Sequence, residues 1–180
     1  MKQIAIFVSL LLAAATLRAQ EHDFDYLLGD WEFSADSIDY GKYGGFWSAI
    51  PLETGQILDQ YRVTDGHGKT WSSTISLRAY NAAKKEWELV STNKNNGVRD
   101  FGVAHREGNE MHIEQTFGAS SEHPSVWHIR YYNIEADRFL WDGECSRDGG
   151  KTYKRCLHID AHRIGPPRLL GQLAPTIKPK

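Results

Sequence analysis

The sequence predicts an all-β domain, folded as an antiparallel up-and-down β-barrel of about eight to ten strands. After residue 30 helical periodicity is scarce, and apolar residues recur instead at every second position, as they do in strands with one buried face. Short turn signals such as Asp148-Gly149-Gly150 separate these segments. Short connections favour antiparallel hairpins, because a parallel crossover needs a dozen or more residues. So many strands in one small domain indicate a closed barrel or a strongly curled meander.

Ten strands are predicted, over residues 31–36, 44–50, 56–64, 71–80, 86–93, 98–106, 110–117, 125–133, 137–146 and 153–163. Most of their apolar residues occupy odd-numbered positions, as in Trp71-Ser72-Ser73-Thr74-Ile75-Ser76-Leu77. Phe101 and Val103 follow the same parity. We therefore expect one buried and one wet face on each strand. The sequence leaves open which parity lines the barrel interior, and the preferred interpretation places the odd positions there.

The first 19 residues are typical of a secretory signal peptide. A basic Lys2 precedes an apolar run, and one small residue, Ala19, stands at the predicted cleavage point. The run covers about a dozen residues, too few to cross a hydrocarbon core, which needs ~20. The expected protein is exported, periplasmic or secreted, with one barrel domain over residues 20–164. Residues 165–180 carry four prolines and are predicted to form a loose tail.

The charge of the chain gives no reason to expect nucleic acid as a partner. Without Lys2 and Arg18, 19 of the 21 basic residues remain against 23 acidic residues, a net of −4. No later segment is apolar enough to span a membrane, and the sequence does not determine the oligomeric state. A small-molecule ligand is the expected partner.

Cys145 and Cys156 flank the last predicted turn, in a chain whose leader indicates a compartment where disulfides persist. A regular hairpin that pairs Phe139 and Trp141 with Leu157 would place the two cysteines on opposite faces. A bulge in the glycine-rich turn would restore the pairing. The sequence leaves both arrangements open.

Two motifs carry a resemblance to a known family. The opening Phe24-Asp25-Tyr26-Leu27-Leu28-Gly29-Asp30-Trp31 resembles that of an uncharacterised family of small, often secreted, bacterial lipocalin-like domains. That family ends in a Ser-x-Asp-Gly-Gly-Lys-Thr-Trp hairpin, similar to SRDGGKTY here, with Tyr153 in place of Trp. The resemblance implies a calycin-type barrel able to hold a small ligand. By analogy with true lipocalins, Trp31 of Gly29-x-Trp31 would lie at the closed end, with Arg163 or Arg155 as its cation–π partner.

SRDGGKTY also fits the Asp-box pattern found in many carbohydrate-active proteins. A single copy between the last two strands indicates turn chemistry rather than glycan hydrolysis. We expect Asp148 to accept hydrogen bonds from backbone amides, and Gly149 and Gly150 to adopt positive φ.

Aromatic residues on the apolar parity are the candidate ligand contacts. If that face lines the interior, they form either a filled core or the walls of a cavity for a flat or apolar ligand. The candidates are Tyr61, Trp71, Trp87, Trp127, Tyr131 and Trp141. The segment Tyr40-Gly41-Lys42-Tyr43-Gly44-Gly45-Phe46-Trp47 is either an entrance strip for that ligand or a bent strand at the barrel end.

The even positions of the last strands are rich in titratable groups. His128, Asp142 or Glu144, and His158 lie on neighbouring strands and suit acid–base chemistry. They support an alternative, a barrel enzyme acting as a hydrolase or isomerase, if that face lines a polar cavity; otherwise they form a solvated exterior. No tight metal-ligand pair is present, so no metal or cofactor is expected. A third interpretation, a surface that binds partners or glycans, requires a row of exposed Trp.

Overall fold

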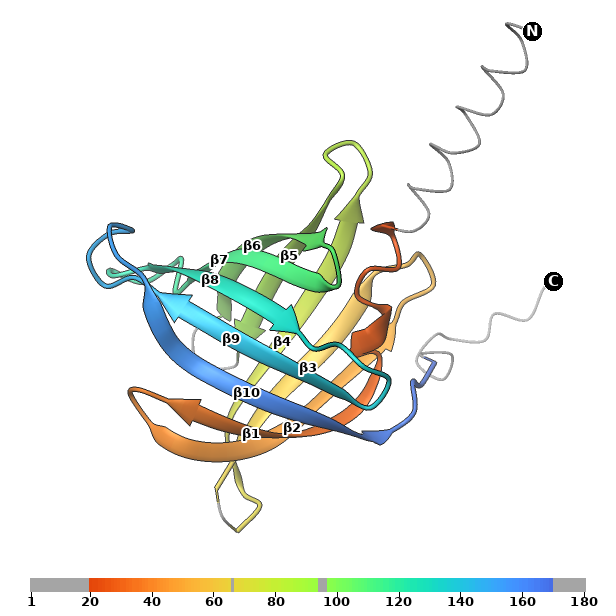
Figure 1. The fold of residues 1–180 in the computed structure, drawn as a ribbon, viewed down its shortest axis with the longest axis horizontal. Coiled ribbons are helices and arrows are strands. Elements are labelled where there is room, and N and C mark those ends of the chain that lie inside the picture. The colour runs from red at the N-terminus through yellow and green to blue at the C-terminus, as the bar shows by residue number, and fades with distance from the viewer. Residues whose placement is uncertain (1–19, 66, 94–96, 170–180) are drawn as a thin grey trace, which may run out of the picture.

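The computed structural model describes residues 20–169 except 66 and 94–96. In it, ten antiparallel strands form a closed barrel in which each strand pairs with the next along the chain and β10 returns to β1 (Figure 1). The predicted up-and-down barrel is confirmed. The predicted leader, residues 1–19, and residues 170–180 of the predicted tail lie outside the described residues.

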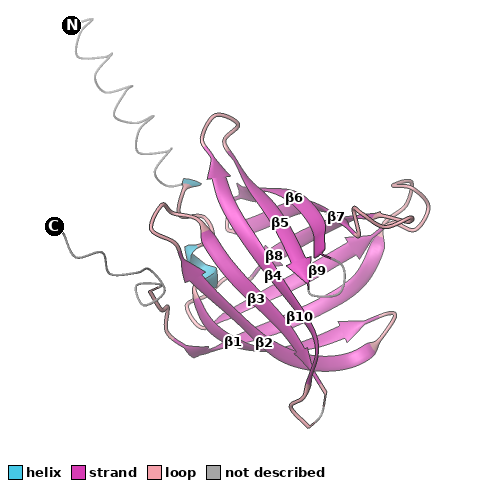
Figure 2. Ribbon diagram, turned by 180° about the vertical axis from the view of Figure 1, so that it is seen from behind, coloured by secondary structure: helices cyan, strands magenta, loops and turns pink. Residues whose placement is uncertain are grey.

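All ten predicted strands are present, with ends shifted by a few residues. They are β1 (Gly29–Ser37), β2 (Gly41–Pro51), β3 (Ile57–Thr64), β4 (Thr70–Asn81), β5 (Glu86–Asn93), β6 (Gly97–Glu107), β7 (Glu110–Phe117), β8 (Ser125–Tyr132), β9 (Arg138–Cys145) and β10 (Lys154–Gly165). A 3₁₀ turn, η1 (Asp25–Leu27), precedes β1 and lies at one end of the barrel (Figure 2). Within the described part of the chain, no helix is both long and apolar enough to cross a membrane.

The segment around η1 closes one end of the barrel. Phe24 and Leu27 are fully buried there, and the indole N–H of Trp31 donates to the carbonyl oxygen of Leu27 at 2.8 Å. The guanidinium of Arg163 lies 4.1 Å from the centre of a Trp31 ring. It also donates to the carbonyl oxygens of Tyr26 and Leu28. The cation–π partner implied by the lipocalin resemblance is therefore Arg163 and not Arg155.

Gly29 makes this closure possible. Its φ is +120°, which L side chains rarely adopt, and a Cβ there would collide with Arg163 Nη1 and with the carbonyl oxygen of Gly165. The glycine therefore allows the first and last strands to meet under the guanidinium.

The predicted parity holds in most strands but is wrong in β4 and β6. Ile75, Leu77, Phe101 and Val103 are exposed on the outside, between 36% and 53%. The even positions face inward instead, and they include the polar residues Ser76, Arg78 and Asp100, which are at most 8% exposed. Alternation therefore identifies these two strands, but their apolar face is the outer one.

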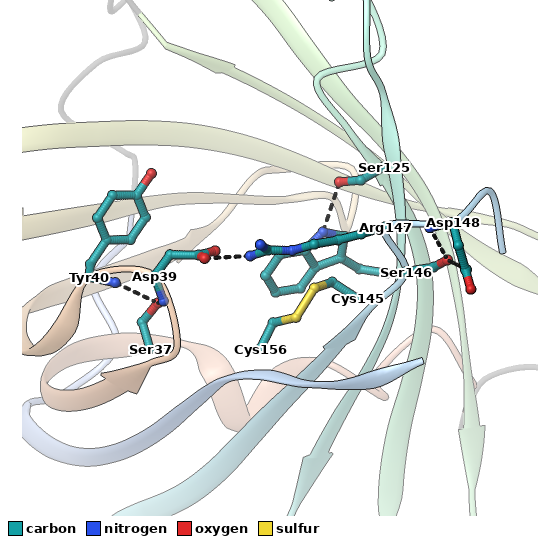
Figure 3. The surroundings of a disulfide bond; sticks show 10 residues. Ser37, Asp39, Tyr40, Ser125, Cys145, Ser146, Arg147, Asp148 and Cys156 are labelled. Atoms are coloured by element: carbon teal, nitrogen blue, oxygen red, sulfur yellow. Dashed lines mark hydrogen bonds and ion pairs between the residues drawn. A yellow bond between two sulfur atoms is a disulfide. The ribbon is translucent and has the colours of Figure 1, made fainter. Parts of the chain in front are cut away.

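Cys145 and Cys156 form a disulfide that ties β9 to β10 (Figure 3). The register shifts between Arg155 and Leu157, so Cys156 occupies an irregularity in the ladder. This bulge places both sulfur atoms on the buried side, where the two residues are 4% and 2% exposed. Of the two arrangements left open by the sequence, the bulged one is therefore observed.

The turn SRDGGKTY is held by its own side chains. Asp148 accepts hydrogen bonds from the backbone N–H groups of Lys151 and Thr152, at 3.1 and 2.9 Å, and from the Thr152 hydroxyl at 2.7 Å. These bonds, chiefly those from Thr152, lower the pKa of Asp148 to about 2. Gly149 and Gly150 have φ of 74° and 83°, as expected. The ring of Tyr153 stacks on His128 with centroids 4.0 Å apart.

Candidate functional site: a cavity inside the barrel

The barrel interior is not completely filled. A cavity of about 360 Å³ extends from residues near the rim, including Tyr40 and Tyr43, to Arg78 and Tyr131 above the closed end. Arg78 marks the bottom, since its guanidinium lies 4.8 Å from the ring centre of Phe24 in the floor. The volume lies in the range of small-molecule sites, toward its lower end.

The bottom of the cavity contains a buried ion pair. Asp59 Oδ2 accepts from Arg78 Nε at 2.6 Å, and Oδ1 accepts from the indole N–H of Trp47 at 2.9 Å. Burial alone would lower the pKa of Arg78, but the charge of Asp59, its hydrogen bond to Arg78 and the nearby Tyr131 and Tyr26 together outweigh burial and raise that pKa. Burial also raises the pKa of Tyr131 to about 12. The guanidinium therefore stays charged and the phenol stays protonated, which fixes the polarity of this surface across the physiological pH range.

Aromatic rings form much of the wall. Of the six predicted contacts, four line the cavity: Tyr61, Trp127, Tyr131 and Trp141. They are joined by Trp47, which packs edge to face on Tyr61 with centroids 5.4 Å apart. Because each ring also packs against other rings, the wall is preorganised.

The other two predicted contacts lie elsewhere. Trp87 is fully buried in the floor, where its indole N–H donates to the carbonyl oxygen of Gln20 and its ring packs against Phe24. Trp71 is 53% exposed at the β3–β4 hairpin and packs against Tyr40 and Tyr43. Its predicted place on the inner face is wrong, because the inner positions of β4 are the even ones. Trp87 belongs to the core and Trp71 to the outer surface.

Small polar side chains complete the lining. Ser76 and Ser91 share a hydrogen bond of 3.0 Å across β4 and β5. Asp100 Oδ1 accepts from the backbone N–H of Gly118 at 2.9 Å. Gln115 also lines the cavity, is 8% exposed, and its amide forms no hydrogen bond with the described residues. The interior is thus a mixed aromatic and polar surface.

The segment from Tyr40 to Trp47 contributes to the mouth. It forms the turn before β2 and the first half of that strand, and Tyr40, Tyr43 and Trp47 all line the cavity. Near the mouth, Asp39 pairs with Arg147, which connects the β1–β2 hairpin to the turn after β9 (Figure 3). The segment is therefore a strand whose Tyr40 and Tyr43 border the entrance, while Trp47 lies deeper, at Asp59.

The titratable cluster of the alternative enzyme lies on the outer face. His158 Nδ1 and Asp142 Oδ1 are 2.7 Å apart, but neither residue lines the cavity. His128 is half-exposed and stacks on Tyr153, and Glu144 is exposed opposite Arg155. His158 pairs with Asp142 and His128 with Glu114 on the outer face of the sheet. No group of three or more metal-binding side chains occurs in the described residues.

Several lining residues were not predicted from the sequence, although two of them carry a signal. Asp59 shares parity with Ile57 and Tyr61, and Gln115 lies between Ile113 and Phe117 on the inner face of β7. A polar residue at a position whose alternate neighbours are apolar indicates a polar side chain that faces the interior. Arg78 and Asp100 carry no such signal. In β4 and β6 the apolar residues occupy odd positions, so these two even-numbered residues look like ordinary outward-facing polar groups.

No protein-family model matches the sequence, and no curated protein matches it. Among solved structures, the crystal structure of Rv2717c from M. tuberculosis is similar with a TM-score of 0.57 at 13% identity, over 81% of this chain and 97% of that chain. Two others have lower scores. A redesigned β-barrel, b11L5F_LGL, has a TM-score of 0.41 at 14% identity, over 78% of this chain and 93% of that one. The structure of EF1p2_mFAP2b bound to DFHBI has a TM-score of 0.38 at 14% identity, over 81% of this chain and 99% of that one. The similarity to Rv2717c concerns the fold alone.

Proposed function

We propose that this protein is an exported binder of a small, partly apolar or aromatic molecule, which it holds inside the barrel. The observation that carries the proposal is the cavity of about 360 Å³, with aromatic walls and a polar bottom. Such a composition is typical of ligand sites, where apolar walls supply affinity and a few placed polar groups orient the ligand.

The binding surface needs little rearrangement. Trp127 is held by a hydrogen bond of 3.0 Å to Ser125 and by an edge contact with Phe117 at 5.0 Å. Trp47 is fixed by its bond to Asp59. A site whose side chains are already ordered loses little entropy on binding, so more of the contact energy contributes to affinity.

Export is supported by two independent features. The predicted signal peptide ends at Ala19, and the Cys145–Cys156 disulfide is of a kind that persists in oxidising compartments. Intact-mass measurement of the exported protein tests this part, since cleavage after Ala19 leaves Gln20 as the first residue. A cytosolic product that retains residues 1–19 would contradict it.

Binding is tested with aromatic probes on the purified, oxidised chain. We expect 2-naphthol to quench tryptophan fluorescence saturably, and Trp127→Ala to weaken its binding about tenfold or more, because a stacking wall is lost. Trp71→Ala is the matched control, since Trp71 lies outside the cavity. Mass spectrometry of small molecules co-purified with the protein adds a probe-free readout. Failure of the protein both to bind any flat aromatic probe and to retain a small molecule would overturn the proposal.

The alternative enzyme has no comparable support. It required His128, Asp142 or Glu144, and His158 to converge on an interior cavity, whereas these side chains lie on the outer face of the barrel. We therefore do not propose catalysis by this cluster.

A further inference from the structure

Gln115 is an unusual residue within the cavity. It lies on the inner face of β7 and is 92% buried, yet its side-chain amide has no hydrogen-bond partner among the described residues. Its amide atoms are not among the fully buried polar atoms that lack a partner, such as Tyr61 Oη and Arg78 Nη1. The amide therefore faces the cavity space, where two donor hydrogens and a carbonyl oxygen are available to a bound molecule.

The surroundings of Gln115 are aromatic and rigid. The strand register places Trp127 of β8 directly opposite Gln115. Trp141 lies on the next strand, β9, where its register partner is Tyr131. Between the two indoles lies Gly143, where a Cβ would collide with both rings. The glycine therefore lets the indoles lie close together. A flat ring that packs on this surface would bring one of its edges to the amide.

The charged groups of the cavity already have partners within the protein. Asp59 pairs with Arg78, Asp39 with Arg147, and Asp100 accepts from a backbone N–H. A ligand therefore needs no charge to compensate them, and a buried charge on the ligand would lose its hydration without gaining a free counter-ion. The free recognition group is a neutral amide.

We propose that the ligand is an uncharged, flat ring system with a lactam-type edge, in which an N–H and a C=O group are adjacent, and that Gln115 recognises this edge. This proposal rests on the proposed function. A primary amide donates and accepts side by side, so it pairs with a lactam through two hydrogen bonds. Rotation of the amide by 180° lets it meet either order of donor and acceptor. Gln115 thus acts as the specificity-determining residue, and the indoles supply most of the contact area.

The proposal is tested with four bicyclic probes of similar size, titrated by tryptophan fluorescence and equilibrium dialysis. 2-Quinolinone carries the lactam edge, 1-methyl-2-quinolinone lacks its N–H, and 3-methyl-2-quinolinone has the extra methyl but keeps the N–H. Naphthalene has neither polar group. The variants are Gln115→Met, which keeps length but removes the amide, and the control Gln60→Met, whose amide lies on β3 and bonds to Ser73.

We expect the wild-type protein and Gln60→Met to bind 2-quinolinone and its 3-methyl derivative about tenfold more tightly than the 1-methyl derivative. Gln115→Met should lose this preference while it binds naphthalene as the wild type does, which also shows that the variant is folded. Equal binding of all three quinolinones by the wild type, or a preference that survives in Gln115→Met, would overturn the assignment but leave small-molecule binding intact. If naphthalene and every quinolinone fail to bind, the proposed function itself fails.

Discussion

Arg78 Nε lies 2.6 Å from Asp59 Oδ2, and both side chains are almost inaccessible inside the barrel. A buried ion pair contributes little net stability, but loss of one partner leaves a buried charge that nothing offsets. We expect Asp59→Asn to lower the free energy of unfolding by about 3–5 kcal/mol in urea denaturation. Glu53→Gln, on an exposed turn, should change it by less than about 0.5 kcal/mol.

The same pair provides a second, stricter comparison. The double variant Asp59→Leu/Arg78→Met should be more stable than Asp59→Asn, because neither charge remains. If the double variant loses as much stability as the sum of the single variants, the two residues are not coupled in the way that their geometry indicates.

At the closed end, Arg163→Met should cost about 2–4 kcal/mol of unfolding free energy, because the cation–π contact with Trp31 and several bonds to backbone carbonyls are lost together. Arg163→Lys should recover only part, since an ammonium cannot reproduce the planar fork. Arg155→Met is the control, because Arg155 is exposed on the same strand. Equal losses for Arg155 and Arg163 would contradict the role of Arg163 in closing the barrel.

The outward position of the apolar residues in β6 can be checked with two phenylalanines. Phe139 is fully buried and Phe101 is 53% exposed. Phe139→Ala should cost about 3–5 kcal/mol in thermal or chemical unfolding, and Phe101→Ala about 1 kcal/mol or less. A large loss for Phe101 would restore the parity first expected from the sequence.

The turn after β9 should respond to acid. The pKa of Asp148 is lowered from 3.8 to about 2 in the folded chain. Between these values the unfolded chain binds more protons, so the stabilising effect of Asp148 is complete above about pH 4 and is lost as the pH falls toward 2. An NMR titration of the carboxyl carbon measures this pKa directly. In Asp148→Asn the corresponding part of the acid dependence should disappear, and a pKa near 3.8 in the wild type would contradict the turn geometry.

Reduction of the disulfide should also destabilise the last hairpin. The cysteines are 11 residues apart, and closing such a loop is worth about 3 kcal/mol in the chain-entropy model. The melting temperature should therefore fall in the presence of a reductant. Cys145→Ala/Cys156→Ala should melt near the reduced wild type and be insensitive to the reductant. Identical melting of the oxidised and reduced wild type would show that the bond does not contribute.

The fold could be predicted from the sequence because strand alternation and turn residues are local signals. The face that each strand turns inward is not local, and in β4 the interior receives Ser76 and Arg78 while Leu77 faces outward. Where a strand lines the polar part of the cavity, its inner face carries polar residues and its outer face carries the apolar ones. In β8 and β9 the apolar residues do face inward, and Trp127 and Trp141 line the cavity.

Features that depend on a single extra residue or on long-range contacts could not be predicted from the sequence. The bulge at Cys156 decides whether the cysteines meet, and it is a property of the ladder rather than of the turn motif. The pairing of Arg78 with Asp59 joins two strands whose charges could each have faced water.

The junction of β1 with β10 has a consequence for biosynthesis. It pairs Trp31 with Arg163, so the ladder closes only after nearly the whole domain has been made. Until β10 has emerged, β1 and β9 each present an unpaired edge, the arrangement that most favours association between chains. The high contact order of the closure also predicts slow folding. The nascent chain would therefore depend on being kept unfolded, or shielded, until its last strand is available.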